Sequence, residues 1–137
     1  MNRRDLQKMA EGKFADAVLL FQNQRHASAY YLAGYAVELA IKAVIAKQIV
    51  AETIPDRQII NRVFTHKLDD LMGLGGLLVR LKEQFRKDPS FQANWGIVSN
   101  WSVESRYEII DPFQAAEMLQ AVGDPEHGIL QWLKTHW

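Results

Sequence analysis

The most regular feature of the sequence is a helical repeat of apolar side chains over residues 3–24. Apolar residues recur three or four positions apart, with charged residues between them, at Leu6, Ala10 (beside Met9), Phe14, Val18 and Phe21. This spacing places the apolar side chains on one face of an α-helix. Asn2 precedes the repeat and is expected to cap the helix. The segment therefore predicts an amphipathic helix with one face on a core.

Residues 27–50 predict a second helix, which is apolar on nearly every side. Small residues recur three or four positions apart in this segment, at Ala29, Ala33, Ala36, Ala40 and Ala43. Such a stripe allows another backbone to approach closely, while Tyr30, Tyr31 and Tyr35 fill the other sides. A helix that is apolar all round is expected to be surrounded by other helices. We therefore place it at the centre of the core, and its surplus of apolar surface also suggests a partner subunit.

The second helix is long enough to span a bilayer, but its composition argues against a membrane. Glu38 and Lys42 lie in the middle of the apolar segment. Each charge costs about 2.5–3.5 kcal/mol at bilayer depth, and no second span is present to form a bundle. We therefore expect a buried helix of a soluble, cytoplasmic protein. Glu38 and Lys42 stand one helical turn apart, in the order that favours an ion pair.

The rest of the chain predicts shorter helices separated by proline, glycine and polar residues. The expected helices cover residues 56–63, 66–72 (capped by Thr65), 77–87, 89–98 (begun by Asp88-Pro89), 112–122 (begun by Asp111-Pro112) and 125–135. Residues 100–111 lack a helical period and predict an ordered loop. No segment has the pattern of a strand. The whole sequence, residues 1–137, predicts a single all-α domain, a helical bundle.

Composition narrows the possible functions. Sixteen basic residues balance sixteen acidic ones, so no global positive field favours non-specific DNA binding. Cysteine is absent, which excludes disulfides and zinc–thiolate sites. The four histidines lie at positions 26, 66, 127 and 136, never at helical metal-site spacing. We find no phosphate-binding glycine loop and no serine or cysteine nucleophile motif, and we expect neither a metal nor a cofactor.

The candidate chemistry is a scattered polar set: Glu38, Lys42, His66, Arg106 and Tyr107. In the structural interpretation, a buried Glu38 forms an ion pair with Lys42 or Arg106. His66 then hydrogen-bonds to the backbone at a helix start. In the same interpretation Trp95 and Trp101 anchor the core. The functional interpretation brings Arg106 and His66 to one groove, where they would bind a phosphate and move a proton.

Three strings give the sequence a resemblance to a known family. They are Ala29-Tyr-Tyr-Leu-Ala-Gly-Tyr-Ala-Val-Glu-Leu-Ala-Ile-Lys-Ala43, Thr65-His-Lys-Leu68 and Trp101-Ser-Val-Glu-Ser-Arg-Tyr-Glu108. In this order they resemble prokaryotic HEPN domains over nearly the whole chain. The resemblance implies an up-and-down bundle of four to five helices, usually a homodimer. Such domains are often encoded beside a minimal nucleotidyltransferase in toxin–antitoxin or defence modules, and many are metal-independent ribonucleases.

The sequence departs from the ribonuclease pattern of this family, in which an arginine is followed after four to six residues by a histidine. No histidine lies in that window after Arg106. We therefore expect a nucleotide- or RNA-binding HEPN domain that acts with a nucleotidyltransferase partner and lacks strong catalysis. One alternative is a ribonuclease toxin that uses Arg106 and His66 as catalytic residues. Another is a purely structural dimerisation module, which a sealed Glu38–Arg106 pair would favour.

Overall fold

The computed structural model describes residues 1–49 and 53–137, which form eight α-helices and one 3-10 helix, η1. In chain order they are α1 (Arg3–Gln22), α2 (His26–Lys47), α3 (Arg57–Val63), α4 (Leu68–Leu74), α5 (Leu78–Lys87), α6 (Pro89–Val98), η1 (Val103–Tyr107), α7 (Pro112–Gly123) and α8 (Ile129–Lys134). No strand occurs among these described residues, and the all-α prediction is confirmed. The proposed end of the second helix, Val50, lies outside them.

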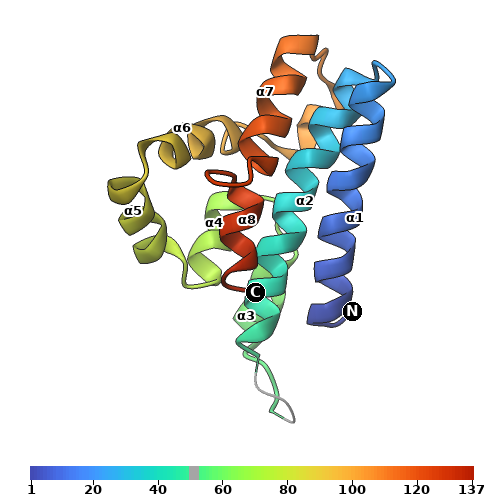
Figure 1. Cartoon of the computed structure of the whole chain (residues 1–137). Coiled ribbons are helices and arrows are strands. Elements are labelled where there is room, and N and C mark those ends of the chain that lie inside the picture. Colours follow the sequence, from blue (N-terminus) through green and yellow to red (C-terminus); the bar gives the residue numbers. More distant parts are fainter. Residues whose placement is uncertain (50–52) are drawn as a thin grey trace.

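Helices α1 and α2 form an antiparallel pair along one side of the molecule (Figure 1). Asn2 caps α1 as predicted: its side chain accepts from the amide of Asp5, whose carboxylate bonds back to the amide of Asn2. This reciprocal arrangement satisfies two amides that a helix start leaves without partners. The turn between the helices contains Gln24 with φ 62°, a left-handed conformation that reverses the chain in a few residues.

Helix α2 is the centre of the core, as its composition predicts. Twelve of its 22 residues are buried, and it packs against α1, α4, α7, α8 and η1. Full burial of a large side chain such as Val37, Leu39 or Ile41 stabilises the fold by roughly 1.5–3 kcal/mol. The helix is long and apolar enough to cross a membrane, but 67% of its most apolar 18-residue window is buried against the rest of the chain.

The last two helices run beside α2 in the same direction as α2 (Figure 1). This direction follows because residues 53–111 return the chain to the level of the first turn of α2, where α7 begins. Helix α7 also approaches α1 closely at Gly123, where a Cβ atom would lie 2.2 Å from the Phe14 ring. Asp88 caps α6 and Asp111 caps α7, each before a proline in the first turn, as predicted. The helices number more than four or five because the Thr65 turn, the glycines at 75 and 76, and Pro89 divide residues 57–98 into four short ones.

Three local predictions differ from the structure. Helix α4 begins at Leu68, not at His66, because the Thr65 hydroxyl accepts from the amide of Lys67 and forms a turn before the helix. Helix α8 begins at Ile129, not at Pro125: Gly128 is extended, and Asp124 accepts from two amides of the preceding turn. The expected loop over residues 100–111 contains η1.

Candidate functional site

One side of α2 is lined by Tyr31, Tyr35, Glu38 and Lys42, which we call the α2 polar side. These residues are four, three and four positions apart, so they lie along one face of the helix. The rings of Tyr31 and Tyr35 stack with centroids 6.2 Å apart and planes inclined by 5°. Burial, Glu38 and Tyr31 together raise the pKa of Tyr35. From the sequence, both tyrosines are expected only to fill sides of the helix away from the alanine stripe. Their spacing from Glu38 already places them on the same helical face as Glu38.

Glu38 is 1% exposed and has two partners. One oxygen accepts from Lys42 Nζ at 3.1 Å, and the other lies 2.8 Å from His66 Nδ1. A buried carboxylate is costly unless it is paired and hydrogen-bonded, and these two contacts supply the pairing. Glu38 therefore forms an ion pair with Lys42, which is one of its two predicted partners. It does not pair with Arg106, the other predicted partner. His66 bonds to this carboxylate, so the prediction that it bonds to the backbone is wrong.

The contact with Glu38 fixes the orientation of the His66 ring. An ionised carboxylate can only accept, so the proton of the neutral imidazole lies on Nδ1 and Nε2 is left as an acceptor. The His66 side chain is 50% exposed. Glu38 thus orients a solvent-accessible imidazole and leaves its Nε2 as a hydrogen-bond acceptor.

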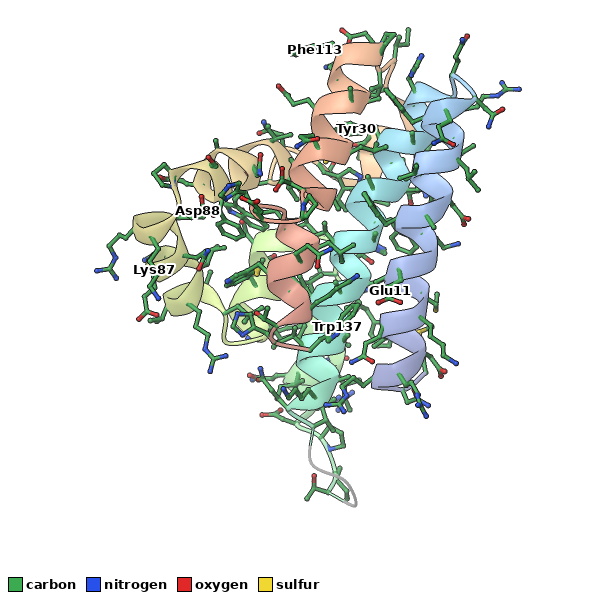
Figure 2. All side chains as sticks on the ribbon, viewed as in Figure 1. Glu11, Tyr30, Lys87, Asp88, Phe113 and Trp137 are labelled. Atoms are coloured by element: carbon green, nitrogen blue, oxygen red, sulfur yellow. The ribbon has the colours of Figure 1, made fainter. Side chains whose placement is uncertain are left out.

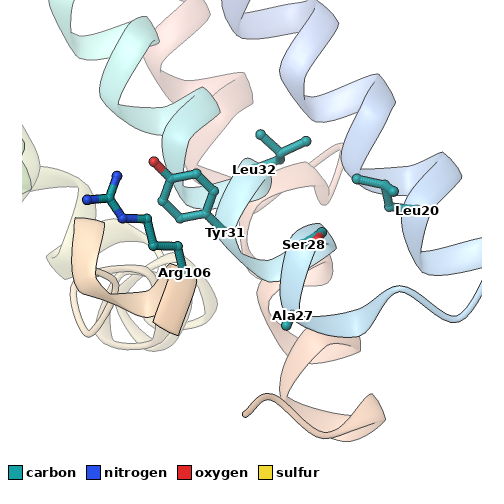
Figure 3. Close-up of a pocket in the computed structure, with 6 residues that line it drawn as sticks. All are labelled: Leu20, Ala27, Ser28, Tyr31, Leu32 and Arg106. Carbon is teal, nitrogen blue, oxygen red and sulfur yellow. The ribbon is translucent and has the colours of Figure 1, made fainter. Parts of the chain in front are cut away.

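Arg106 and Tyr107 are the last two residues of η1. The Arg106 guanidinium carbon is 4.9 Å from the centroid of the Tyr107 ring. Figure 3 shows the guanidinium beside the hydroxyl end of Tyr31. Tyr107 and Tyr31 both raise the pKa of Arg106, which stays charged. Arg106 is exposed, and Tyr107 is 73% exposed.

Beside Arg106 is a cavity of about 330 Å³, the Arg106 cavity. It is lined by Leu20, Ala27, Ser28, Tyr31, Leu32 and Arg106 (Figure 3). Its lining has one cation, the hydroxyl groups of Ser28 and Tyr31, and apolar side chains, with no carboxylate among the described residues. Cavities of this size and composition suit a ligand with a flat apolar part and a negative group.

Trp101 holds η1 against α2 and so sets the position of Arg106. Its ring lies directly on Gly34, where a Cβ atom would come within 2.2 Å of the indole. Its Nε1 donates to the backbone oxygen of Tyr31 at 3.2 Å. Trp101 and Trp95 are both buried, so their predicted role as core anchors is confirmed. Within η1, Ser105 is buried and its hydroxyl accepts from the amide of Ser102.

The structure brings the predicted site residues together as two groups: Glu38 with Lys42 and His66, and Arg106 with Tyr107. Arg106 lies at the level of Tyr31 and His66 at that of Glu38, which are about 10 Å apart along the helix axis. No ion pair or hydrogen bond joins Arg106 to His66 in the described part of the chain. His66 instead borders a separate cavity of about 340 Å³, between the start of α4 and η1.

Comparisons with known proteins identify the family. No curated protein and no solved structure matches the chain at a significant level. A family model described as the HEPN domain matches residues 4–135, which is nearly the entire length. The match covers both groups of site residues and all eight helices except the first residue of α1. The chain therefore belongs to the HEPN domain family.

Proposed function

We propose that this HEPN domain binds single-stranded RNA or a nucleotide through Arg106 and Tyr107. The observation that supports this proposal is the exposed Arg106 guanidinium, which lies between the Tyr107 ring and the Tyr31 hydroxyl beside the Arg106 cavity. The guanidinium would contact a phosphate, and the exposed Tyr107 ring would stack on a base. Stacking on an aromatic side chain contributes about 1–3 kcal/mol per base.

The charge distribution agrees with a local site. The chain has no net charge, so a long electrostatic groove is not expected. An arginine that is pre-oriented by two rings loses less conformational entropy on binding a phosphate than a free side chain does. The ligand would therefore be short, of the order of one to a few nucleotides.

Fluorescence anisotropy with a labelled single-stranded oligoribonucleotide, and calorimetry with AMP, test this function. Arg106→Ala and Tyr107→Ala are each expected to weaken binding about tenfold. Arg86→Ala, which removes the same charge from an exposed position on α5, is the matched control and is expected to change affinity less than twofold. Equal losses in all three variants, or no binding by the wild type, would reject the proposal.

We further propose that the domain acts in the cytoplasm with a nucleotidyltransferase partner, in a module of the toxin–antitoxin or defence type. The family strings on α2, at His66 and in η1 support this role. Co-expression with a nucleotidyltransferase encoded beside it, followed by size-exclusion chromatography, is expected to give a joint peak. Separate elution at micromolar concentrations of both proteins would count against the partnership.

A second candidate function is metal-independent RNA cleavage, and the Glu38–His66 contact of 2.8 Å favours it. The contact resembles the carboxylate–imidazole pairs that orient a general base. In this case RNA cleavage would persist in the presence of a chelator and be lost in His66→Ala and Arg106→Ala. Binding without cleavage would leave only the first function. A purely structural module has less support, because Arg106 and Glu38 do not form a sealed pair.

A further inference from the structure

A separate cavity of about 440 Å³ lies at the other end of α2, and we call it the Lys47 cavity. By the helical period, the α2 residues that line it, Val44 and Lys47, face away from the α2 polar side. Arg80 from the first turn of α5 and His136, which follows α8, complete its polar lining together with Gln48. Three basic side chains from distant parts of the sequence therefore border one cavity, and no carboxylate of residues 1–49 or 53–137 lines it.

Contacts among these groups define what each can still bind. Arg80 Nη1 lies 3.0 Å from His136 Nδ1. Because a guanidinium can only donate, Nδ1 accepts, and the neutral imidazole carries its proton on Nε2. Lys47 Nζ donates to the backbone oxygen of His136 at 3.4 Å. Further N–H groups of Lys47 and Arg80, and the Nε2–H of His136, have no acceptor among the described residues.

The cations at the Lys47 cavity have no carboxylate partner in the part of the chain that the structure describes. Neither Lys47 nor Arg80 forms an ion pair there, and Arg80 does not pair with Glu83, which lies one turn along α5. Burial and the charges of Arg80 and Lys47 lower the pKa of His136. Arg80 also lies in the first turn of α5, where a cation opposes the helix dipole. A bound anion would interact favourably with both cations.

We propose that the Lys47 cavity is a phosphate-binding site, distinct from the Arg106 cavity. Arg80 would bind two phosphate oxygens with its planar N–H groups, Lys47 would add a point charge, and His136 would donate through Nε2. The volume lies within the range of small-ligand sites. The phosphate belongs either to a free nucleotide or to an RNA backbone, since both present the same chemistry to these residues.

Titration of the full chain with inorganic phosphate, followed by the NMR resonance of the His136 ring, tests the site. Phosphate is expected to raise the pKa of His136, because a bound anion favours the imidazolium form. The double variant Lys47→Gln/Arg80→Gln is expected to weaken phosphate binding at least tenfold. The control Arg86→Gln/Lys87→Gln removes the same charge from the far end of α5 and is expected to stay within twofold of the wild type.

Parallel titrations identify the source of the phosphate. Displacement of phosphate by AMP alone indicates a nucleotide, and displacement by a short single-stranded RNA indicates a backbone phosphate. Arg106→Ala separates this site from the proposed function, since it is expected to reduce RNA binding at the Arg106 cavity without changing the His136 response. A wild-type His136 resonance that responds to none of the three ligands overturns the proposal, as does an equal loss in both double variants.

Discussion

The imidazole Nδ1 of His127 lies 2.6 Å from the carboxylate of Asp88, and this contact joins the turn before α8 to the start of α6. The other oxygen of Asp88 accepts from the amide of Phe91 and caps α6. Asp124 accepts from the amide of His127, and Glu126 lies 3.6 Å from Nε2, so the charged groups around the ring are all acidic. The hydrogen bond between the two side chains lowers the pKa of Asp88 and raises the pKa of His127.

This contact predicts a stability contribution confined to mildly acidic pH. Because the folded pKa of His127 is raised, its contribution is complete below about pH 6.5 and is lost as the pH rises through the folded pKa. The pKa of Asp88 is lowered in the folded state. The contribution of Asp88 to stability is therefore lost only as the pH falls through this lowered pKa. His127→Gln is therefore expected to lower the melting temperature more at about pH 5.5 than at about pH 9.

Asp88→Asn is the matched variant for this prediction. Asparagine still caps a helix, but it cannot stabilise an imidazolium ion. It is expected to reproduce the pH-dependent loss while α6 remains capped. Thermal unfolding curves at both pH values provide the measurement. If Asp88→Asn lowered the melting temperature equally at the two pH values, the assigned role of the ion pair would be contradicted.

Gly34→Ala tests the contact that positions η1. The added methyl group would meet the Trp101 ring, which is buried and cannot move away freely. Overpacking of this kind is expected to destabilise the fold by about 2 kcal/mol. It should also weaken RNA binding, because displacement of Trp101 moves Arg106 away from Tyr31. Urea denaturation and anisotropy provide the two measurements.

Gly12→Ala is the control, because no atom lies within 4 Å of a Cβ at this exposed position in α1. Alanine is the better helix former, so this variant is expected to gain about 1 kcal/mol and to bind RNA normally. If both glycine variants had the same stability, the Trp101 contact would not be the constraint described above.

Replacement of Glu38 tests the buried polar group. Glu38→Ala leaves Lys42 and His66 without their shared acceptor and is expected to cost about 3 kcal/mol in urea unfolding. His66→Ala removes a half-exposed partner and is expected to cost about 1 kcal/mol. The double variant should cost less than the sum of the two, since the residues are in contact. Strict additivity would show that the contact adds nothing to stability.

The proposed homodimer can be tested at the exposed apolar residues that follow Arg106. Ile109 and Phe113 are 98% and 72% exposed, and they follow the proposed RNA-binding residues Arg106 and Tyr107. Such exposure within five residues suggests that a second copy covers the segment from Ile109 to Phe113. Ile109→Lys/Phe113→Lys is expected to weaken dimerisation at least tenfold in sedimentation experiments. Val79→Lys, at a 69% exposed position on α5, is the control. A monomeric wild type would contradict the dimer itself.

Sequence analysis predicted those features that depend on neighbouring residues. Helical spacing sufficed for α1 and α2, and an aspartate before proline located the starts of α6 and α7. The same type of signal failed at Asp124-Pro125, because Asp124 caps a turn and the extended Gly128 delays the helix. Local pattern alone cannot distinguish a capped turn from a capped helix.

The candidate sites depend on contacts between distant residues, and these were harder to predict. The choice of His66 as the second partner of Glu38 depends on how α4 packs against α2. The Lys47 cavity takes its basic residues from α2, α5 and the end of the chain, so no segment of the sequence contains a motif for it. Spacing along α2 could have revealed the polar side, because Tyr31, Tyr35 and Glu38 share one helical face.

The central position of α2 has a consequence for biosynthesis. Helix α7, which covers it, begins 65 residues after α2 ends, and α8 follows α7. At ribosomal rates of about 5–20 residues per second, the nascent chain therefore presents this apolar helix for roughly 3–13 s before synthesis of α7 begins. During that interval Glu38 and Lys42 are the charges in its middle that disfavour insertion into a bilayer. The ion pair that lines the finished site thus also protects the unfinished chain.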